Sequence, residues 1–586
     1  MAQEPVIGID LGTTNSEVAF VFNDTPVVIE DGDRGIMPSC VGIDRNGRLI
    51  VGRTARNQAA AFPGDTVLAV KRQMGTDTRY TLGDQEYSPQ EISAMILKTL
   101  KARAEDAIGG PVQKAVITVP AYFTDVQRQA TRDAGRIAGL EVLRIINEPT
   151  AAALAYGEAG RDEDRHILIY DLGGGTFDVS IVKIEAGVVE VLASTGDNRL
   201  GGEDFDEALV AYLLDHIREH HGRDLADDPV AAARLKSAAE VAKMQLSDEF
   251  FVHIEEDHLA PDLHLSCEVS RDLFEEMIQP LIEKTMTSVA KALRDAALSP
   301  GRLDKVILVG GSTRIPMVSR LLSGELNIEP DIGIDPDLCV ALGAGIQAGR
   351  EMGKSIQSML IDITPYTFGT SAFGMLDGRH YPHCFVPLIR RNTKLPATRT
   401  EAFQTLVDNQ AAADINVYQG DHPDALDNIR IGTYTFDLSK APAGSVITLR
   451  YDLDLNGILT LEAREKDTGK TINAVLENVF SQSGTGISES RDKVGALFPG
   501  DNAPSKELPS TGEPPRPEPG PDAVLPPAIA GILDQAREKL PLAPDEDKDD
   551  IINLMEDITE ACARNDPDRA GKLAEDLEDI LFYIGE

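Results

Sequence analysis

Two glycine-rich stretches, each containing an aspartate, carry the residue types that could hold a phosphorylated ligand. They are VIGIDLGTTNSEVAF at 6–20, with Asp10, and ILIYDLGGGTFDVSIV at 167–182, with Asp171. Successive glycines let backbone N–H groups approach a ligand closely, and threonine hydroxyls add donors. A pair of aspartates can hold a hydrated Mg²⁺. The repeated pattern of strand, aspartate, glycine turn and strand therefore predicts two similar halves that clamp one anionic ligand.

The spacing of these glycines does not fit a Walker A loop, which requires GxxxxGK[ST] between a strand and a helix. Two GK[ST] triplets occur, at 353–355 and 469–471, and neither has a glycine five residues before its own glycine. A single glycine-rich hairpin is more often an ordinary tight turn. Two copies, each with a preceding aspartate, favour a pair of β-hairpins that bind phosphates through backbone N–H groups and threonine hydroxyls.

Length, charge and cysteine content limit the classes of function. The chain has 586 residues, a net charge of −40 and a hydrophobic share of 42%. Several domains are therefore expected, and neither nucleic acid nor an anionic membrane is expected as a partner, because both are polyanions. No secretion signal and no run of about eighteen apolar residues is found. Five scattered cysteines without a CxxC pair predict reduced thiols in a cytoplasm, with no disulfide framework or zinc site.

Six motifs in a fixed order carry a family resemblance. They are IDLGTTNS, VPAYF, INEPTAAALAYG, DLGGGTFD, LGGEDFD and VGGSTRIP. From residue 6 to about residue 480 the chain resembles the seventy-kilodalton heat-shock chaperones of the DnaK type. Its shortened segment at 74–85 is similar to short bacterial paralogues of the HscC type. The resemblance implies an ATPase that uses ATP and Mg²⁺, with K⁺ as a further ion. It also implies a stress-response chaperone that binds exposed apolar segments of unfolded proteins, with an affinity cycled by ATP binding and hydrolysis.

The resemblance implies a multidomain protein with an α/β part and a β part. An actin-like, two-lobed nucleotide-binding domain is expected at 1–354, an interdomain linker at 355–363 and a β-sandwich substrate-binding domain at 364–482. The stretch 445–463 supports the sandwich, because apolar and polar residues alternate on both sides of Asn456-Gly457, a strong hairpin signal.

The last hundred residues differ in character from the rest. The stretch 483–523 is rich in Pro, Glu and Ser and cannot bury enough apolar area to offset chain entropy, so a disordered tether is predicted. Apolar residues at helical spacing then predict a short acidic helical segment at 524–586. This segment is much shorter than the long helical lid of DnaK.

Catalytic roles follow from the resemblance, residue by residue. Lys71 would reach the terminal phosphate and orient the attacking water, where an ammonium stabilises charge on the transferring phosphoryl group. Glu148 would position the metal-bound water, and Asp171 would act as the base or orient that water. Thr176 would lie nearest the terminal phosphate. Asp10 and Asp171 would hold the metal ion.

The nucleotide is expected between two walls. Glu240, Lys243 and Ser247 are spaced three and four residues apart in an alanine-rich helix, and so they share one face. Arg314 would lie against adenine on the other side. By resemblance, the full set of nucleotide-binding residues is Gly12, Thr13, Thr14, Asn15, Gly173, Gly174, Gly175, Gly201, Gly202, Glu203, Glu240, Lys243, Ser247, Gly310, Gly311, Ser312, Arg314 and Asp337.

The resemblance also implies communication between the two domains. Pro120 matches the family's proline switch, Arg128 its arginine relay and Asp362 the aspartate that closes the linker. The partners implied are unfolded or extended polypeptide clients, a J-domain co-chaperone and a nucleotide-exchange factor.

The family's peptide groove maps onto residues that would otherwise be assigned to the core of the sandwich. The pocket positions are Thr370, Phe403, Ala413, Ile415 and Ile447, with Phe373 and Leu406 arching above. Because two of these positions hold smaller residues than the aliphatics of the family, a wider or more polar pocket is expected. An inserted stretch near 377–384 should lengthen one loop beside the groove.

Two other classes of function share the phosphate-clamping fold. One is a small-molecule kinase, which would need an acceptor pocket with a catalytic aspartate, and the other is a filament-forming, actin-like protein. Neither class gives a reason for the β-rich stretch at 364–480.

Overall fold

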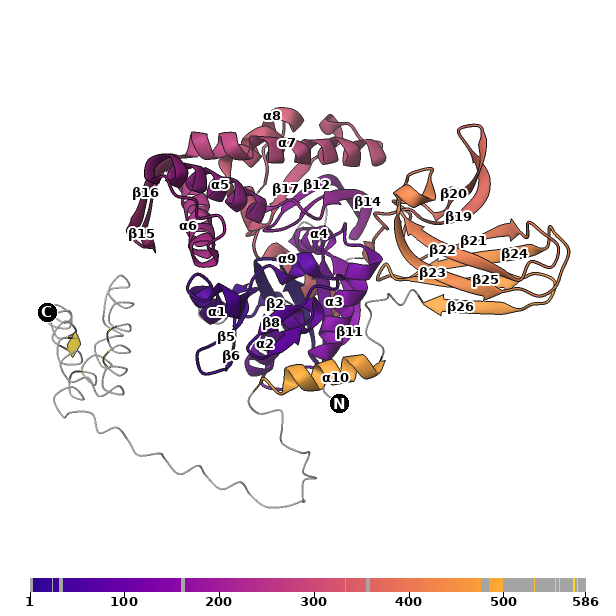
Figure 1. Cartoon of the computed structure of the whole chain (residues 1–586), viewed down its shortest axis with the longest axis horizontal. Coiled ribbons are helices and arrows are strands. Elements are labelled where there is room, and N and C mark those ends of the chain that lie inside the picture. Colours follow the sequence, from indigo (N-terminus) through magenta and orange to yellow (C-terminus); the bar gives the residue numbers. More distant parts are fainter. Residues whose placement is uncertain are drawn as a thin grey trace, which may run out of the picture. The chain divides into compact units, whose positions relative to one another are not determined.

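Two mixed β-sheets with the same connectivity organise the N-terminal part of the chain in the computed structural model (Figure 1). Their strand orders are β11-β10-β1-β2-β3, with β4 beside β2, and β17-β12-β13-β14-β18. In each sheet the strand that leads into the glycine turn, β1 or β12, runs parallel to one neighbour and antiparallel to the other. The duplicated motif of the sequence thus forms two equivalent hairpins. The strands are β1 Val6–Leu11, β2 Asn15–Phe22, β3 Thr25–Val28, β4 Met37–Pro38, β10 Lys114–Val119, β11 Glu141–Asn147, β12 Arg165–Leu172, β13 Phe177–Glu185, β14 Val188–Asp197, β17 Lys305–Val309 and β18 Met359–Ile361.

The structure describes residues 4–498 except 24, 31–34, 160–163, 332, 355–358 and 476–483. Contacts divide the chain into two units, Met1–Ala503 and Pro504–Glu586. Most of the expected C-terminal helical segment and most of the expected tether lie outside the described residues. No helix within the described part is long and apolar enough to cross a membrane. Beyond residue 500 the described residues, all helical, are Ile532, Leu554, Ile558, Leu573, Ala574 and Leu577.

Helices α4 (Glu148–Ala159) and α9 (Cys339–Glu351) pack against each other in a core that both sheets share. The two helices approach closely, because a Cβ at Gly343 of α9 would lie 1.8 Å from the carbonyl oxygen of Ala151 in α4. Only glycine fits at this crossing. The contact places α4, which directly follows β11, next to both halves of the duplicated fold.

Each sheet has a second core, formed with helices of its own half. α2 and α3 pack with the first sheet, and α5 to α8 pack with the second. Ser88 and Glu91 form a capping box at the start of α2, and Thr124 and Gln127 form the same box at the start of α3. These helices are α1 Arg53–Ala59, α2 Pro89–Ile108, α3 Asp125–Ile137, α5 Gly202–His221, α6 Pro229–Asp248, α7 Arg271–Asp295 and α8 Pro316–Leu326, with the short 3-10 helices η1 Pro63–Asp65, η2 Val70–Gln73, η3 Pro300–Arg302 and η4 Gly311–Arg314.

Three small sheets complete this part of the chain. One joins β6, β5 and β7, and the other two are the hairpins β8-β9 and β15-β16. The shortened segment of the sequence falls on β8 and its turn. The strands are β5 Val41–Ile43, β6 Leu49–Val51, β7 Thr66–Val67, β8 Tyr80–Leu82, β9 Gln85–Tyr87, β15 Phe251–Ala260 and β16 Leu263–Ser270.

The chain from β19 onward forms two four-stranded sheets, β20-β19-β22-β23 and β21-β24-β25-β26. They share one apolar core, in which Val417, Tyr451 and Leu461 are fully buried. The hairpin predicted at Asn456-Gly457 is confirmed, since β24 and β25 pair in antiparallel fashion and Gly457 has a φ of 74°. The elements are β19 Phe368–Leu376, β20 Arg379–Ile389, β21 Ala397–Gln404, β22 Ala412–Gln419, η5 Ala425–Asp427, β23 Ile429–Asp437, β24 Val446–Leu453, β25 Leu459–Glu465 and β26 Thr471–Val475.

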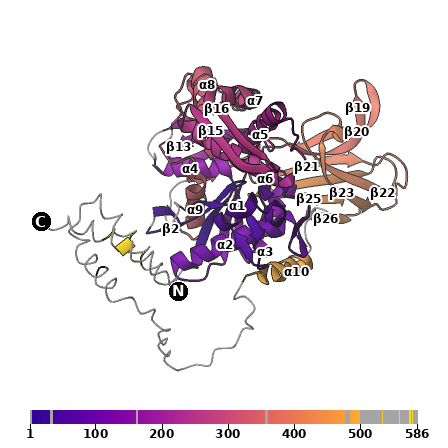
Figure 2. The ribbon, with the colours of Figure 1, turned by 60° about the vertical axis from the view of Figure 1, so that its left-hand side comes forward.

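The inserted stretch of the sandwich forms strands instead of a longer loop. β19 pairs with β20 as far as Leu376 opposite Arg379. Asp377 and Gly378 form a two-residue turn with φ values of 49° and 76°, as in a type I′ turn, for which Asp-Gly is favoured. The loop predicted near 377–384 is therefore wrong, because the local turn chemistry allows a continuous hairpin. In Figures 1 and 2 this hairpin extends beyond the rest of the sandwich.

Two connecting segments pack on the N-terminal part. β18, in the predicted linker, pairs in parallel with β14, with Met359 opposite Val188. Helix α10 (Gly484–Gly495) contacts α2 and α3 and buries Val494 completely in their core. The disordered tether predicted from residue 483 is therefore wrong for 484–498. Composition alone could not show that the few apolar side chains of this stretch meet an apolar surface of another domain.

Candidate nucleotide-binding and catalytic site

The two glycine turns meet at one cleft. A Cβ at Gly174 would lie 1.9 Å from Oγ1 of Thr14, so the turns approach each other at a distance that only glycine allows. Asp10 and Asp171 are each the last residue but one of the equivalent strands β1 and β12. Both line the same cleft, which has a volume of about 1190 Å³. The duplicated sequence motif thus places two carboxylates and two glycine turns around one ligand-sized space.

Lys71 lies among several buried carboxylates at the bottom of the cleft. Its ammonium forms an ion pair with Glu148, and both side chains are buried. The hydroxyl of Thr118 donates to Oδ1 of Asp10 at 2.6 Å. Burial raises the pKa of Glu148 to about 7, although Lys71 opposes the shift. Burial also raises the pKa of Asp10 and raises that of Asp171 well above its ordinary value. One ammonium therefore does not offset the negative charge that these groups would carry when ionised.

The carboxylates fit a hydrated divalent cation that binds together with phosphates. Oδ2 of Asp171 is buried and has no hydrogen-bond partner among the described residues. Among those residues, no cluster of three or more His, Cys, Asp or Glu side chains could hold a metal by itself. Mg²⁺ is usually bound by one or two carboxylates together with water and substrate phosphates. The donors present therefore suit a Mg²⁺ that enters with the nucleotide.

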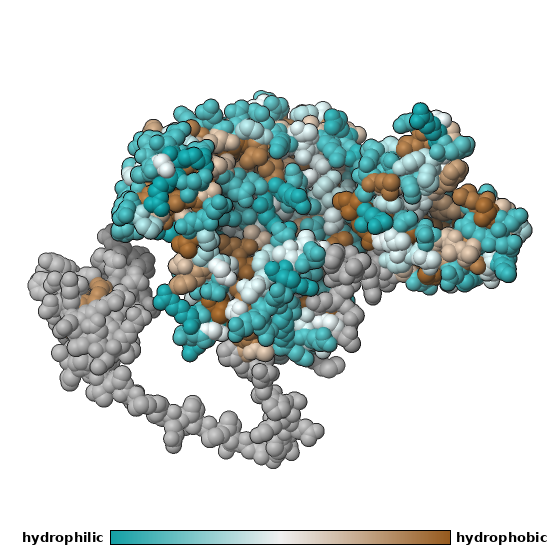
Figure 3. Space-filling model, in the orientation of Figure 1, coloured by the Kyte–Doolittle hydropathy of each residue, from teal (hydrophilic) through white to brown (hydrophobic). Residues whose placement is uncertain are grey.

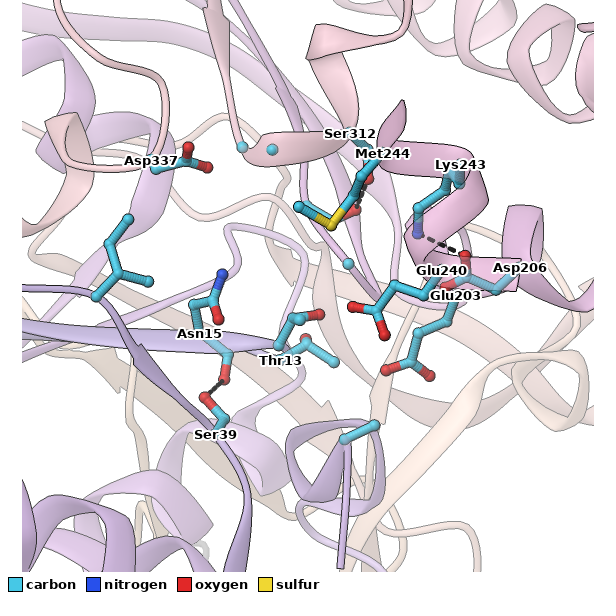
Figure 4. A pocket seen from close by; sticks show the side chains of 18 of the residues that line it. Thr13, Asn15, Ser39, Glu203, Asp206, Glu240, Lys243, Met244, Ser312 and Asp337 are labelled. Carbon is cyan, nitrogen blue, oxygen red and sulfur yellow. Dashed lines mark hydrogen bonds and ion pairs between the residues drawn. The ribbon is translucent and has the colours of Figure 1, made fainter. Parts of the chain in front are cut away.

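One side of the cleft is formed by α6 and the start of α5. The predicted face of Glu240, Lys243 and Ser247 lines the cleft. The ammonium of Lys243 pairs with Oδ1 of Asp206 at 2.7 Å and donates to the Gly202 carbonyl at 3.0 Å. Figure 4 shows Glu240, Lys243 and Asp206 grouped together on this side. Helix α6 is thereby tied to the start of α5.

The loop after β17 lines the cleft beside α6. The hydroxyl of Ser312 donates to the carbonyl of Gly173 at 2.9 Å, which ties this loop to the second glycine turn. The guanidinium of Arg314 contacts Oδ1 of Asp335 at 2.8 Å and Oδ2 of Asp337 at 2.7 Å. Both contacts are made by one guanidinium nitrogen, Nη2, and hold the end of the side chain at the border of the cleft. Stacking of a flat ring on Arg314 stays a prediction.

The structure gathers most of the predicted nucleotide and catalytic residues around this cleft. Gly175, Gly201 and Gly202 do not line it. Gly201 and Gly202 support the second turn instead, since the N–H of Gly202 donates to the Gly173 carbonyl at 3.0 Å. The predicted residues that line the cleft are Asp10, Gly12, Thr13, Thr14, Asn15, Lys71, Glu148, Asp171, Gly173, Gly174, Thr176, Glu203, Glu240, Lys243, Ser247, Gly310, Gly311, Ser312, Arg314 and Asp337.

Sequence reasoning missed several polar residues that line the cleft. Among them are Ser39, Arg56, Asp206 and Lys236. Asp206 lies within the motif LGGEDFD and could have been found from it. Arg56 lies on α1, in a stretch without a motif, and it forms an ion pair with Glu240 of α6. Only the folded chain brings these two residues together, because 184 positions separate them.

Comparison with known proteins identifies the family of this chain. A family model described as "Hsp70 protein" matches residues 6–81 and 78–494. The chain belongs to the Hsp70 family. It is also 40% identical over 597 residues to "Chaperone protein DnaK" of Thermotoga neapolitana, a match that covers 100% of this chain and 97% of that protein. Membership confirms the predicted family, the ATPase activity and the ATP-dependent chaperone function. It does not favour a kinase or a filament former.

In this Hsp70 protein the predicted coupling residues lie near one another. The guanidinium of Arg128 donates to Oδ1 of Asn147 at 2.6 Å, and the amide nitrogen of Asn147 donates to Oδ2 of Asp362 at 3.0 Å. Pro120 directly follows the neighbouring strand β10, and its carbonyl accepts from the N–H of Phe123 at 3.1 Å. Asn147 was missed, although it directly precedes Glu148 in the motif INEPTAAALAYG. It joins the arginine to the linker.

The predicted peptide-binding residues of this Hsp70 protein divide into buried and exposed positions. Ile415 and Ile447 belong to the core of the sandwich, and Phe403 and Ala413 pack against it. Thr370 is also buried. The two arch residues are exposed, Phe373 to 53% and Leu406 to 66%, and Figure 3 shows apolar side chains at the surface of the sandwich.

The side chain of Thr370 does not leave a free hydroxyl in the sandwich. Its Oγ1 donates to the carbonyl of Asn416 at 2.8 Å. A hydroxyl that is already hydrogen-bonded adds little polarity to a neighbouring pocket. The hydrogen bond of Thr370 therefore does not support a more polar pocket. A wider pocket stays a prediction.

We expect Lys71→Ala to abolish turnover while ATP binding is retained. Loss of an ammonium that stabilises the transferring phosphoryl group costs about 10²–10³ in kcat, whereas ground-state contacts mostly remain. Single-turnover hydrolysis and equilibrium nucleotide binding measure the two effects separately. Lys236→Ala is the matched control, because Lys236 also lines the cleft but is 39% exposed and lies 3.9 Å from Glu203. Near-normal hydrolysis by Lys71→Ala would contradict the role of Lys71.

Proposed function

We propose that ATP hydrolysis in this cleft controls the affinity of the sandwich for extended polypeptide. The proposal assigns nucleotide binding to 1–354, an actin-like domain, interdomain communication to 355–363 and substrate binding to 364–482. The observation that carries it is the path of contacts from the cleft to the sandwich. It runs from Glu148 through its neighbour Asn147 to the carboxylate of Asp362, whose backbone carbonyl accepts from the N–H of Leu395, just before β21 of the sandwich, at 2.8 Å.

At the cleft, each proposed role rests on the position of a side chain. Asp10 and Asp171 would hold Mg²⁺, which withdraws electron density from the phosphates when bound. Lys71 would stabilise charge on the terminal phosphoryl group, and its ion pair with Glu148 keeps the ammonium in place. Asp171 and Glu148 would orient the attacking water, and the hydroxyl of Thr176 would donate to the terminal phosphate. The glycine turns would bind the remaining phosphate oxygens through backbone N–H groups.

The turn between β24 and β25 of the sandwich also contacts the region around Arg128. Oδ1 of Asn456, in the β24-β25 turn, accepts a hydrogen bond from the N–H of Ile145 at 3.0 Å. The neighbouring Gly457 lies against Arg128, since a Cβ there would be 3.6 Å from that side chain. The sandwich and the linker therefore both contact the Arg128 region. A change at Glu148 that moves β11 would therefore alter the contacts of both the sandwich and the linker.

The proposed partners follow from family membership. Clients would be apolar segments of unfolded polypeptide, and a J-domain protein and a nucleotide-exchange factor would regulate hydrolysis and nucleotide release. The ion pair between Arg56 and Glu240 joins α1 to α6 and must break if the cleft opens between these helices. It is therefore a contact that an exchange factor would have to disrupt. K⁺ remains a proposed further ion of the site.

Steady-state ATPase activity, measured with and without an unfolded apolar peptide, tests this function. We expect the peptide to stimulate hydrolysis, because binding in the sandwich would shift the equilibrium of the contacts at Arg128 and Asp362. A peptide of equal length composed of charged residues is the control and should have no effect. Unchanged hydrolysis with every apolar peptide would contradict coupling between the two domains.

Docking of the sandwich on the N-terminal part of the chain should weaken as the pH rises toward about 7. Oδ1 of Asp125 accepts from the N–H of Leu459 at 3.3 Å, and burial raises the pKa of Asp125 to about 7. When the sandwich separates, this carboxyl regains water and its ordinary pKa of about 3.9. The docked state then binds more protons between these two values, so docking loses stability as pH rises through that window.

The Asp125→Asn variant isolates this effect, since the amide oxygen can still accept from Leu459. We expect its docked fraction, measured by energy transfer between one dye on each domain, to be nearly independent of pH from 5 to 8. The wild-type protein should dock less at pH 8 than at pH 5. Asp106→Asn, at an exposed position of α2, is the control and should follow the wild type. Equal pH dependence in both variants would contradict the assignment to Asp125.

A further inference from the structure

Glu17 of β2 is a buried carboxylate in the nucleotide cleft that has no role in the proposed phosphoryl chemistry. Its side chain is 2% exposed, and the residue lines the cleft. Within the described residues, no group donates a hydrogen bond to this carboxylate and no cation forms an ion pair with it. Charged side chains are almost never fully buried unless they are paired or coordinate a metal ion. Glu17 therefore lacks the partner that a buried carboxylate requires.

The register of the β1-β2 hairpin places Glu17 beside Asp10. The two residues are directly opposite each other in this antiparallel pair. Side chains of opposite residues point to the same face of the sheet, with Cβ atoms about 4.5–5.5 Å apart. Like charges directly opposite each other destabilise a sheet. Two ionised carboxylates at this separation repel each other unless a cation lies between them.

The fixed charges near Glu17 do not neutralise it. Burial raises the pKa of Glu17 well above its ordinary value, and the charges of Asp10 and Asp337 raise it further. Lys71 opposes this shift, but its ammonium forms its ion pair with Glu148. The ionised form of Glu17 is thus disfavoured until a further positive charge enters the cleft.

The fold leaves the cleft as the place from which that charge can come. Helix α9 covers the same face of β2 at Ala19, since a Cβ at Gly345 would lie 3.0 Å from the Cβ of Ala19. Ala19 and Glu17 are two residues apart and so share this face. Glu17 is the nearer of the two to the first glycine turn and lines the cleft, into which a small ion can enter with water or phosphate.

We propose that a second divalent cation binds between Glu17 and Asp10, beside the Mg²⁺ that enters with the nucleotide. This inference rests on the proposed function, in which Asp10 and Asp171 hold that Mg²⁺. Carboxylate oxygens suit hard cations such as Mg²⁺ and Mn²⁺, and water and phosphate oxygens would complete the coordination. Pairs of divalent ions beside a phosphate chain also occur in other phosphoryl-transfer enzymes.

Counting bound Mn²⁺ tests the proposal on the full-length protein. The ADP complex, freed of excess nucleotide, is titrated with Mn²⁺ in potassium chloride buffer, which keeps sites for monovalent cations filled. Electron paramagnetic resonance measures the free Mn²⁺. We expect two bound ions in the wild type and one in Glu17→Gln, whose amide keeps the shape of the side chain without its charge. The second ion should bind at least about tenfold more weakly to Glu17→Gln, because ligand charge sets cation affinity.

Three checks show whether the effect belongs to this pair of carboxylates. Glu240→Gln makes the same change at a carboxylate that lines the cleft but pairs with Arg56, so it should keep both ions. Glu17→Asp keeps the charge on a shorter side chain and should keep the second ion with lower affinity. Thermal unfolding in a chelator should give Glu17→Gln a midpoint no lower than that of the wild type, since repulsion with Asp10 is removed.

The remaining outcomes separate this proposal from the proposed function. One bound ion in both the wild type and Glu17→Gln would overturn the second site and leave the proposed function intact, because that function needs a single Mg²⁺. Loss of the second ion in Glu240→Gln as well would overturn its assignment to Glu17 and Asp10. If the wild-type ADP complex binds no Mn²⁺, the magnesium site of the proposed function is wrong and this inference falls with it.

Discussion

The contact between the two glycine turns determines the arrangement of the whole nucleotide cleft. Gly174 lies so close to Thr14 that a single Cβ would be only 1.9 Å from the threonine oxygen. This approach brings the ends of β1 and β12 together, and with them Asp10 and Asp171. Both carboxylates are buried there, and burial raises the pKa of each. The cleft is therefore prepared for cationic and phosphate groups before a ligand enters.

Two adjacent residues, Asn147 and Glu148, connect the site to the rest of the chain. Glu148 can pair with Lys71 only because α4 begins at this residue, directly after β11. Asn147, one position earlier, faces the other way and contacts Arg128 and Asp362. Two neighbouring residues thus face two different environments, the cleft and the linker. A small displacement of this strand end changes both sets of contacts together, which is the physical basis of the proposed coupling.

Much of the site could be predicted because its signals are local in sequence. A glycine turn after an aspartate needs only a few adjacent residues, and Asp10 and Asp171 were assigned to one cleft on that basis. The pair of Arg56 and Glu240 could not be predicted, since neither residue lies in a motif that names its partner. Helix α10 was missed for a related reason: Val494 is buried against α2 and α3, and composition does not show distant surfaces.

The β19-β20 hairpin is a case in which a local sequence signal was present but was not used. The insertion was recognised, but Asp377-Gly378 was not used as a turn signal, so a loop was expected where strands form.

Release of a labelled peptide from its preformed complex tests the central claim most directly. The account predicts that adding ATP accelerates release by at least about tenfold over adding ADP, because nucleotide state at the cleft alters the contacts of the sandwich. Equal release rates with ATP and ADP would contradict it.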